Sequence, residues 1–291
     1  MSVSQSAPYR GEMIDLGGRA LRVVRAGPPG AAASPLVVLE HGAFGCAADW
    51  AVVQEKLAAK GLRSLAYDRA GIGHSDPGPD PRDGHAIVSD LAALLHRLEE
   101  TGPLVVVGHS MGALMVRLFA LTHPDRVRGV VLVDPVTPDV MHQPAAARAV
   151  YAFGRMLRWV SFGAQFGLMR PVSVVSGNLI GLTGQAAVEK RRIHASAPHA
   201  RGAAAEVARW PATSDQAAAS EFPSQLPVAV VTAGAAQGSA WLKSVMSVPA
   251  IASRHGYVEH VARANHASLL GRRFGDPIIR GIEHVVHASR R

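Results

Sequence analysis

Short runs of apolar, mostly β-branched residues alternate with amphipathic stretches along most of the chain. The apolar runs lie at residues 37–39, 64–68, 104–110, 130–134 and 228–234, and their length and composition predict buried strands. The amphipathic stretches at residues 48–61, 85–102 and 112–124 predict helices that end at Gly61, Gly102 and Pro124. Because nearly all-apolar strands that alternate with helices form parallel sheets covered on both faces, the pattern predicts an α/β fold.

Three further strands complete the predicted sheet, and a last helix follows them near the end of the chain. Two apolar runs flank Gly17 and Gly18, which predicts an antiparallel hairpin, and residues 28–35 predict a loop. Residues 256–261 predict a last strand, and residues 276–289 predict a last helix. The whole pattern therefore predicts a mostly parallel, eight-stranded sheet flanked by helices.

The alternation stops between about Pro138 and Pro227. The stretches at residues 153–170, 185–197 and 201–210 are helical in pattern, with no strand run between them. An all-helical insertion in an alternating chain is most simply a lid over the ligand-binding edge of the sheet. We therefore expect a core domain of residues 1–137 and 227–291, and a helical cap of residues 138–226.

Composition narrows the possible classes of function. The 291 residues hold one cysteine, Cys46, so no internal disulfide is expected. No apolar run approaches membrane-spanning length and no secretory signal is seen, so we expect a cytoplasmic protein with no membrane partner. The net charge is +8, but the arginines are spread along the whole chain. We therefore expect no nucleic-acid partner. Neither metal-ligand spacing nor a dinucleotide fingerprint is present, so we expect no metal and no cofactor.

Residues 108–112 read Gly-His-Ser-Met-Gly, with an apolar strand before them and a helix after them. In this G-x-S-x-G context a sharp strand-to-helix turn exposes the serine hydroxyl, and the two glycines avoid clashes with neighbouring backbone. We therefore predict Ser110 as a nucleophile and the N–H of Met111, at the helix N-terminus, as one oxyanion donor.

The chain resembles the α/β-hydrolase superfamily over nearly its full length. The residues that carry the resemblance are His41-Gly42 after the third strand, Asp68-Arg69-Ala70-Gly71-Ile72-Gly73-His74-Ser75 after the fourth, the turn at Ser110, and Asn265-His266 near the end. The resemblance implies that Ala43 or Phe44 supplies the second oxyanion N–H. Glu40 ends a strand that should be buried, so it either pairs with Arg69 or lies at a wet strand end.

His266 is the predicted base. It follows a predicted strand, precedes an apolar helical segment, and comes after the serine in the order expected of this fold. His260 is the nearest competitor, but it lies within the strand pattern. The predicted acid is Asp134, at the end of the sixth strand, because no acidic residue follows the seventh strand, where most relatives carry it. Asp139 and a Ser–His dyad without an acid are the alternatives.

The predicted cap carries many aromatic residues, and residues at the site complete the expected pocket. We predict a pocket lined by His41, Gly42, His109, Trp159 and Phe162 for a small-to-medium, largely apolar acyl substrate.

The predicted function is hydrolysis of a carboxylic ester or lactone through an acyl-enzyme on Ser110. Two alternatives use the same residues: hydrolysis of a carbon–carbon bond in a diketone, and cofactor-free perhydrolysis. A third is a ligand receptor with little turnover. The missing seventh-strand acid favours the receptor, whereas the intact Ser110, His266 and glycine turn argue against it. The oligomeric state is left open, with a homodimer as one possibility.

Overall fold

The computed structural model of the protein describes residues 9–29, 34–176, 178–234 and 240–290. Its single eight-stranded sheet has the order β1-β2-β4-β3-β5-β6-β7-β8, with β1 and β2 antiparallel to their neighbours and the other pairs parallel. The predicted α/β fold is thus confirmed. The strands are β1 (Glu12–Asp15), β2 (Ala20–Ala26), β3 (Leu36–Glu40), β4 (Ser64–Tyr67), β5 (Leu104–His109), β6 (Val127–Val133), β7 (Val228–Ala233) and β8 (Gly256–Val261).

The β1–β2 hairpin has the turn that its two glycines predict. Gly17 and Gly18 both have positive φ angles, 92° and 95°, as the central residues of a type I′ turn require. The N–H of Leu16 closes the turn by donating to the carbonyl of Arg19 at 2.8 Å. The predicted loop at residues 28–35 lies partly outside the described residues.

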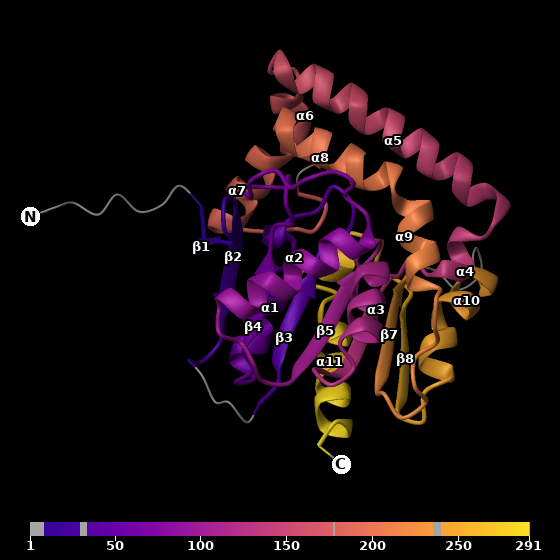
Figure 1. Ribbon diagram of the computed structural model, residues 1–291. Helices are drawn as coiled ribbons and strands as arrows, with labels where there is room; N and C mark the ends of the chain where they lie inside the picture. The colour runs from indigo at the N-terminus through magenta and orange to yellow at the C-terminus, as the bar shows by residue number, and fades with distance from the viewer. Residues whose placement is uncertain (1–8, 30–33, 177, 235–239, 291) are drawn as a thin grey trace, which may run out of the picture.

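Helices cover both faces of the sheet (Figure 1). On one face, α1 (Ala51–Ala59), preceded by a 3₁₀ turn (Ala47–Trp50), and α11 (Asp276–Ala288) bury Trp50, Leu57, Ile278 and Val285 against the strands. On the other face, α2 (Gly84–Arg97) and α3 (Gly112–Thr122) bury Leu91, Leu94, Val116 and Phe119. A second 3₁₀ turn spans Ser268–Leu270.

One expectation for the core helices is wrong, and one core helix has no counterpart among the predictions. Helix α2 ends at Arg97 rather than at Gly102, because Glu99 adopts a left-handed conformation, with φ 55°, and turns the chain there. Helix α10 (Ala240–Ile251) lies between β7 and β8 and was not predicted. Pro249 lies inside this helix, and an internal proline argues against a helix when only the sequence is known. Ser247 and Ala250 of α10 are nevertheless buried.

Between β6 and β7 the described residues form helices and no strand. Figure 1 shows these helices gathered beyond the carboxyl ends of the parallel strands. Helix α5 packs on α8 through a small apolar cluster that includes Val150, Leu157, Ala203 and Val207. The division into a core and a cap domain at the stated residues stays a prediction. The helices are α4 (Pro138–Met141), α5 (Pro144–Gln165), α6 (Met169–Ser176), α7 (Gly184–His194), α8 (Ala197–Ala208) and α9 (Trp210–Ala217).

None of the helices within the described residues combines the length and the apolar character that crossing a lipid bilayer requires.

Candidate active site

Ser110 occupies the tight bend between β5 and α3. Its φ angle is 55°, a left-handed conformation that costs a residue with a side chain roughly 1–2 kcal/mol. Neighbouring backbone holds it there: its N–H donates to the carbonyl of Val133 at 3.0 Å, and its own carbonyl accepts from the N–H of Val136 at 3.0 Å. The serine is therefore fixed beside the end of β6 in a strained conformation.

The two glycines of the bend are required by close backbone contacts. A Cβ on Gly108 would lie 2.5 Å from the carbonyl oxygen of Gly112, and a Cβ on Gly112 would lie 2.6 Å from that of Glu40. A Cβ on Gly42, in the loop after β3, would lie 3.0 Å from Cβ of Ser110. The β3 loop thus packs directly against the serine.

Asp134, immediately after β6, pairs with His266. Its Oδ2 lies 2.6 Å from Nδ1 of the imidazole, and its Oδ1 accepts the N–H of Ala233 at 3.0 Å. Burial acts to raise the pKa of Asp134, but the hydrogen bonds from His266 and Ala233 together outweigh it and hold the pKa below its ordinary value. The carboxylate is therefore ionised at neutral pH and able to orient the ring.

The loop that carries His266 is held on two sides. Oδ1 of Asn265 accepts the N–H groups of Ala267 and Ser268, at 3.2 and 2.8 Å. On the other side, Nε2–H of His109 donates to the carbonyl of His266 at 3.1 Å, and the two rings lie 4.5 Å apart. Burial, reinforced by His266, lowers the pKa of His109 to about 3, so this ring stays neutral. His109 thus positions the loop, and the side chain of His266 stays 54% exposed.

The three predicted catalytic residues come to the same edge of the sheet. The described residues provide no hydrogen bond between the Ser110 hydroxyl and His266. Such bonds commonly tighten only in the complex with substrate. His260, the competing histidine, lies on β8 with Nδ1 2.5 Å from the hydroxyl of Thr232. Asp139 lies in the first turn of α4, and the acid bonded to His266 is Asp134. The catalytic roles of Ser110, His266 and Asp134 remain predictions.

The loop after β3 carries the two candidates for the second oxyanion donor, Ala43 and Phe44. Phe44 has a φ angle of 53°, and its ring stacks on His194 and His199 at 4.5 and 4.6 Å. Within the described residues, no protein acceptor binds the N–H of Ala43, Phe44 or Met111. All three are free to donate, and the choice between Ala43 and Phe44 stays open.

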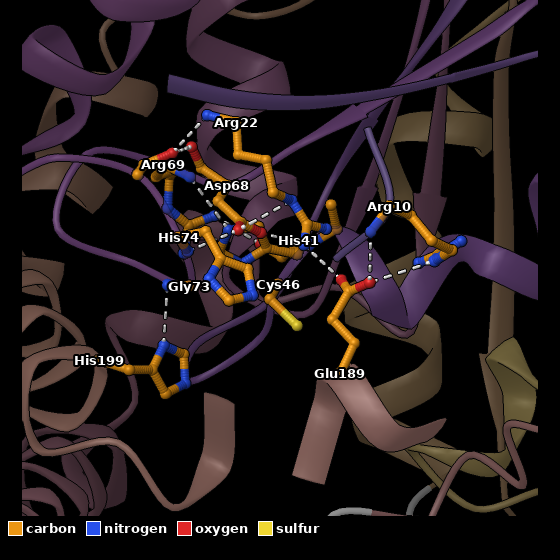
Figure 2. A network of polar contacts seen from close by, with 12 residues as sticks. Arg10, Arg22, His41, Cys46, Asp68, Arg69, Gly73, His74, Glu189 and His199 are labelled. Carbon is orange, nitrogen blue, oxygen red and sulfur yellow. Dashed lines mark hydrogen bonds and ion pairs between the residues drawn. The ribbon is translucent and has the colours of Figure 1, made fainter. Parts of the chain in front are cut away.

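Behind this loop lies a network of buried charges, shown in Figure 2. Asp68 accepts the N–H groups of Ala47 and His74, at 2.7 and 2.9 Å, and lies 3.2 Å from Nε of Arg22. Arg22 also pairs with Glu189 of α7. The side chains of Arg22, Asp68 and Glu189 are at most 1% exposed, so α7 is tied to the sheet by charges sealed from water.

A second buried cluster centres on Arg69. It pairs with Glu40, which confirms the predicted partner, and with Glu206 of α8 at 2.8 and 2.7 Å. It also donates to the carbonyls of His41 and Gly42, at 2.6 and 3.2 Å. The cluster therefore fixes the start of the β3 loop. Sequence reasoning missed Glu189 and Glu206, since a lone acid in an amphipathic helix is normally solvated.

Part of the predicted pocket does not match this arrangement. His41 is fully buried, with Nδ1 2.8 Å from the carbonyl of Gly42, and burial lowers its pKa well below the ordinary value. Trp159 and Phe162 lie on the solvent side of α5, 69% and 55% exposed, while the opposite side of the helix packs on α8. The structure therefore gives these two aromatic residues no contact with the candidate site, and their place in the pocket stays a prediction.

The described residues contain no group of three or more His, Cys, Asp or Glu side chains that could hold a metal ion.

Comparison with known proteins matches part of the chain to a family of known fold. The model of the alpha/beta hydrolase fold matches residues 35–161. Epoxide hydrolase A of Mycobacterium tuberculosis is 36% identical over 140 residues, which cover 46% of this chain and 42% of that protein. Matches to the first curated relatives thus span less than half of their length.

Two solved structures show the same fold along nearly the whole chain. An epoxide hydrolase of Vigna radiata has a TM-score of 0.71 at 16% identity, covering 94% of this chain and 97% of that one. A thermophilic esterase of Thermogutta terrifontis has a TM-score of 0.66 at 21% identity, covering 95% and 98%. Together with the strand order, these matches show that the chain has the alpha/beta hydrolase fold.

Proposed function

We propose that the protein is a serine hydrolase that cleaves a carboxylic ester or lactone of a small-to-medium, largely apolar substrate. His266 takes the proton of the Ser110 hydroxyl as Oγ attacks the acyl carbon, and Asp134 stabilises the imidazolium. The N–H of Met111, with that of Ala43 or Phe44, binds the oxyanion. His266 then protonates the leaving oxygen and activates the water that releases the acyl group.

The observation that carries this proposal is the pairing of Asp134 with His266 at 2.6 Å, next to a serine in a left-handed conformation. The pair spans 132 residues of sequence. An ionised acid that holds Nδ1 leaves Nε2 as the basic nitrogen, which is the tautomer that a serine nucleophile needs.

The residue at the bend favours acyl transfer over epoxide opening. Several relatives are named as epoxide hydrolases and others as esterases or lipases. A carboxylate at position 110 would attack an epoxide carbon and form an alkyl ester, whereas the hydroxyl of Ser110 activated by a base forms an acyl ester. The difference in nucleophile therefore supports ester or lactone cleavage for this chain.

Labelling with a fluorophosphonate tests the nucleophile. We expect rapid modification of wild-type protein at Ser110, located by peptide mass spectrometry, and none in Ser110→Ala. Hydrolysis of nitrophenyl esters of graded chain length should show burst kinetics that are lost in the same variant. Failure of the wild type to label would support the alternative of a ligand receptor with little turnover.

Parallel assays separate the two remaining enzyme alternatives. Turnover of vinylogous diketones above that of esters would favour carbon–carbon bond hydrolysis, and peroxide-dependent halogenation would favour perhydrolysis. We expect esters or lactones to give the highest kcat/KM.

A further inference from the structure

Helix α5 has two apolar sides, although packing on the protein uses only one. Val150 and Leu157 face α8 and are buried there. On the opposite side and at the C-cap, four aromatic side chains lie mainly in solvent, with exposed fractions of 55–69%: Tyr151, Trp159, Phe162 and, at the C-cap, Phe166. Scattered apolar residues on a surface need no explanation, but a contiguous exposed row marks an interaction site.

These aromatic residues form one continuous row along the helix. With Arg155 they occupy positions 151, 155, 159, 162 and 166, which is the spacing of a single helical face. Successive rings touch: Trp159 lies 6.3 Å from Phe162, and Phe162 lies 5.2 Å from Phe166. The guanidinium of Arg155 lies over the ring of Tyr151 at 5.7 Å. This row, the aromatic stripe, is about 22 Å long at the α-helical rise.

The charge around the aromatic stripe has one sign. The sequence contains no aspartate or glutamate between Asp139 and Glu189. The same segment holds four arginines, all exposed: Arg148, Arg155, Arg158 and Arg170. Aromatic residues interleaved with unpaired basic residues are typical of helices that lie in the interface of an anionic bilayer.

A basic hollow lies next to the stripe. It has a volume of about 560 Å³ and is lined by Arg170 at the start of α6 and by Arg191 and Arg192 of α7, together with Ser173 and Val188. The described residues that line it include no carboxylate. Three guanidinium groups around one hollow match a phosphate group, which arginine binds with paired hydrogen bonds.

We infer that the aromatic stripe and the basic hollow form a docking surface for a lipid bilayer that carries anionic phospholipids. The rings enter the headgroup boundary and the arginines meet the phosphates. A second copy of this chain fits less well, because a twofold interface would oppose each arginine row with itself. The inference replaces the sequence expectation that the protein has no membrane partner.

The position of the surface gives the docking a direction. Helix α5 is the outermost element on the side of the molecule that lies beyond the carboxyl ends of the strands (Figure 1). In the docked protein the helices of residues 138–217 therefore face the membrane. The carboxyl ends of the strands lie behind these helices, farther from the membrane. This inference concerns binding alone and holds whether or not the proposed hydrolase activity is found.

Vesicle flotation with purified full-length protein tests the inference. We expect binding to vesicles that contain phosphatidylglycerol, weak binding to pure phosphatidylcholine, and release by high salt. The variant Trp159→Ser/Phe162→Ser/Phe166→Ser should lose at least about tenfold in affinity. Arg155→Gln and Arg158→Gln should each lose about fivefold on the anionic vesicles.

Matched controls remove exposed groups of the same kind elsewhere. Trp241→Ser/Ile251→Ser, on the exposed side of α10, and Arg254→Gln should bind as the wild type does. Equal binding by the stripe variant and this control, or no flotation of the wild type, would overturn the inference. A concentration-dependent dimer that the stripe variant abolishes, without vesicle binding, would also overturn it and identify a self-association face.

Fluorescence quenching provides a second measurement that does not depend on a triple substitution. Brominated lipids in anionic vesicles should quench the tryptophan emission of the wild type. The quenching should vanish in Trp159→Phe and persist in Trp241→Phe. Quenching that persists in Trp159→Phe would contradict insertion of the stripe.

Discussion

Two sets of opposite charges lie at the carboxyl ends of the central strands, and they differ in their contact with water. Asp134 and His266 form a pair whose imidazole is 54% exposed. Arg69, with Glu40 and Glu206, forms a cluster in which no side chain is more than 1% exposed. Both join segments far apart in sequence. Only the first is open to solvent.

The exposed pair is suited to proton transfer, whereas the buried cluster is suited to holding elements of the fold together. A proton-transfer residue must change its charge during each turnover, which requires water or substrate at the ring. Burial acts to lower the pKa of the Arg69 guanidinium, but Glu206 and Glu40 outweigh it and raise the pKa, so Arg69 keeps its charge. One edge of the sheet thus holds a pair that solvent can reach and a cluster that ties α8 to β3 and β4.

Removing the negative charge of Asp134 should have the largest effect, and the effect should be on activity. We expect Asp134→Asn to lower kcat by about 10⁴-fold, because an amide no longer holds the imidazole in the required tautomer. Steady-state assays on the best nitrophenyl ester measure this, with a thermal melt to check folding. Asp139→Asn is the control and should leave kcat near the wild-type value. Retention of more than a tenth of the activity in Asp134→Asn would reject Asp134 as the acid.

Breaking the sealed cluster should cost stability instead. We expect Arg69→Met to lower the free energy of unfolding by about 3–5 kcal/mol, because Glu40 and Glu206 are left buried without their cation. Arg272→Met, which breaks an exposed pair with Glu55, should leave the free energy of unfolding nearly unchanged. Urea denaturation compares the two variants.

If Arg69→Met is too unstable to purify, Glu40→Gln/Arg69→Met/Glu206→Gln provides the test. Neutralising the whole cluster should recover much of the loss, because replacing a complete buried ion cluster is often nearly neutral. Equal losses in Arg69→Met and Arg272→Met would show that the sealed cluster is not an anchor.

Lowering the pH should reduce the stability of the fold through its buried, neutral histidines. Burial, assisted by nearby positive charge, lowers the pKa of His199 to about 3. The unfolded chain binds a proton near pH 6.5 and the folded chain does not, so stability falls as the pH drops from 6.5 toward 3.

The slope should reach about 1.4 kcal/mol per pH unit for each such histidine. Urea midpoints at pH 7, 6 and 5 measure it. His199→Gln should reduce the slope by about one histidine's share, whereas His255→Gln, on the surface, should leave it as in the wild type. An unchanged slope in His199→Gln would contradict a neutral buried ring at this position.

The smallest expected effect concerns the backbone of the bend. Ser110→Gly and Ser110→Ala both remove the hydroxyl, but only glycine relieves the left-handed φ angle. We expect the glycine variant to be more stable than the alanine variant by about 1 kcal/mol, with both inactive. Thermal melts of the two proteins provide the comparison. A more stable alanine variant would show that the bend carries no strain.

Much of the fold was predictable because its signals are local. Buried parallel strands are continuous apolar runs, and the Gly17-Gly18 turn requires two residues with positive φ. The signals failed where one residue overrode a pattern. Glu99 takes a left-handed conformation usually left to glycine and so ends α2 early, while Pro249 hides α10.

The candidate site was predictable in part for the same reason. Ser110 belongs to a five-residue motif, and Asp134 was reached from its place at a strand end. Glu206 had no such signal, since its partner Arg69 is 137 residues away and its own helix is amphipathic in pattern. Aromatic spacing alone does not tell which side of α5 faces the protein, so the exposure of Trp159 and Phe162 could not be predicted from the sequence.

The buried charges of α7 and α8 also limit how this chain can be shortened. Deleting residues 138–226 would remove Glu189 and Glu206 together, and leave Arg22 and Arg69 with half of their carboxylate partners in cavities newly opened to solvent. The helical segment is therefore not a module that recombination can exchange freely. A shortened or grafted descendant would have to change positions 22, 49 and 69 in the same step, because Lys190, the partner of Asp49, would leave with the segment.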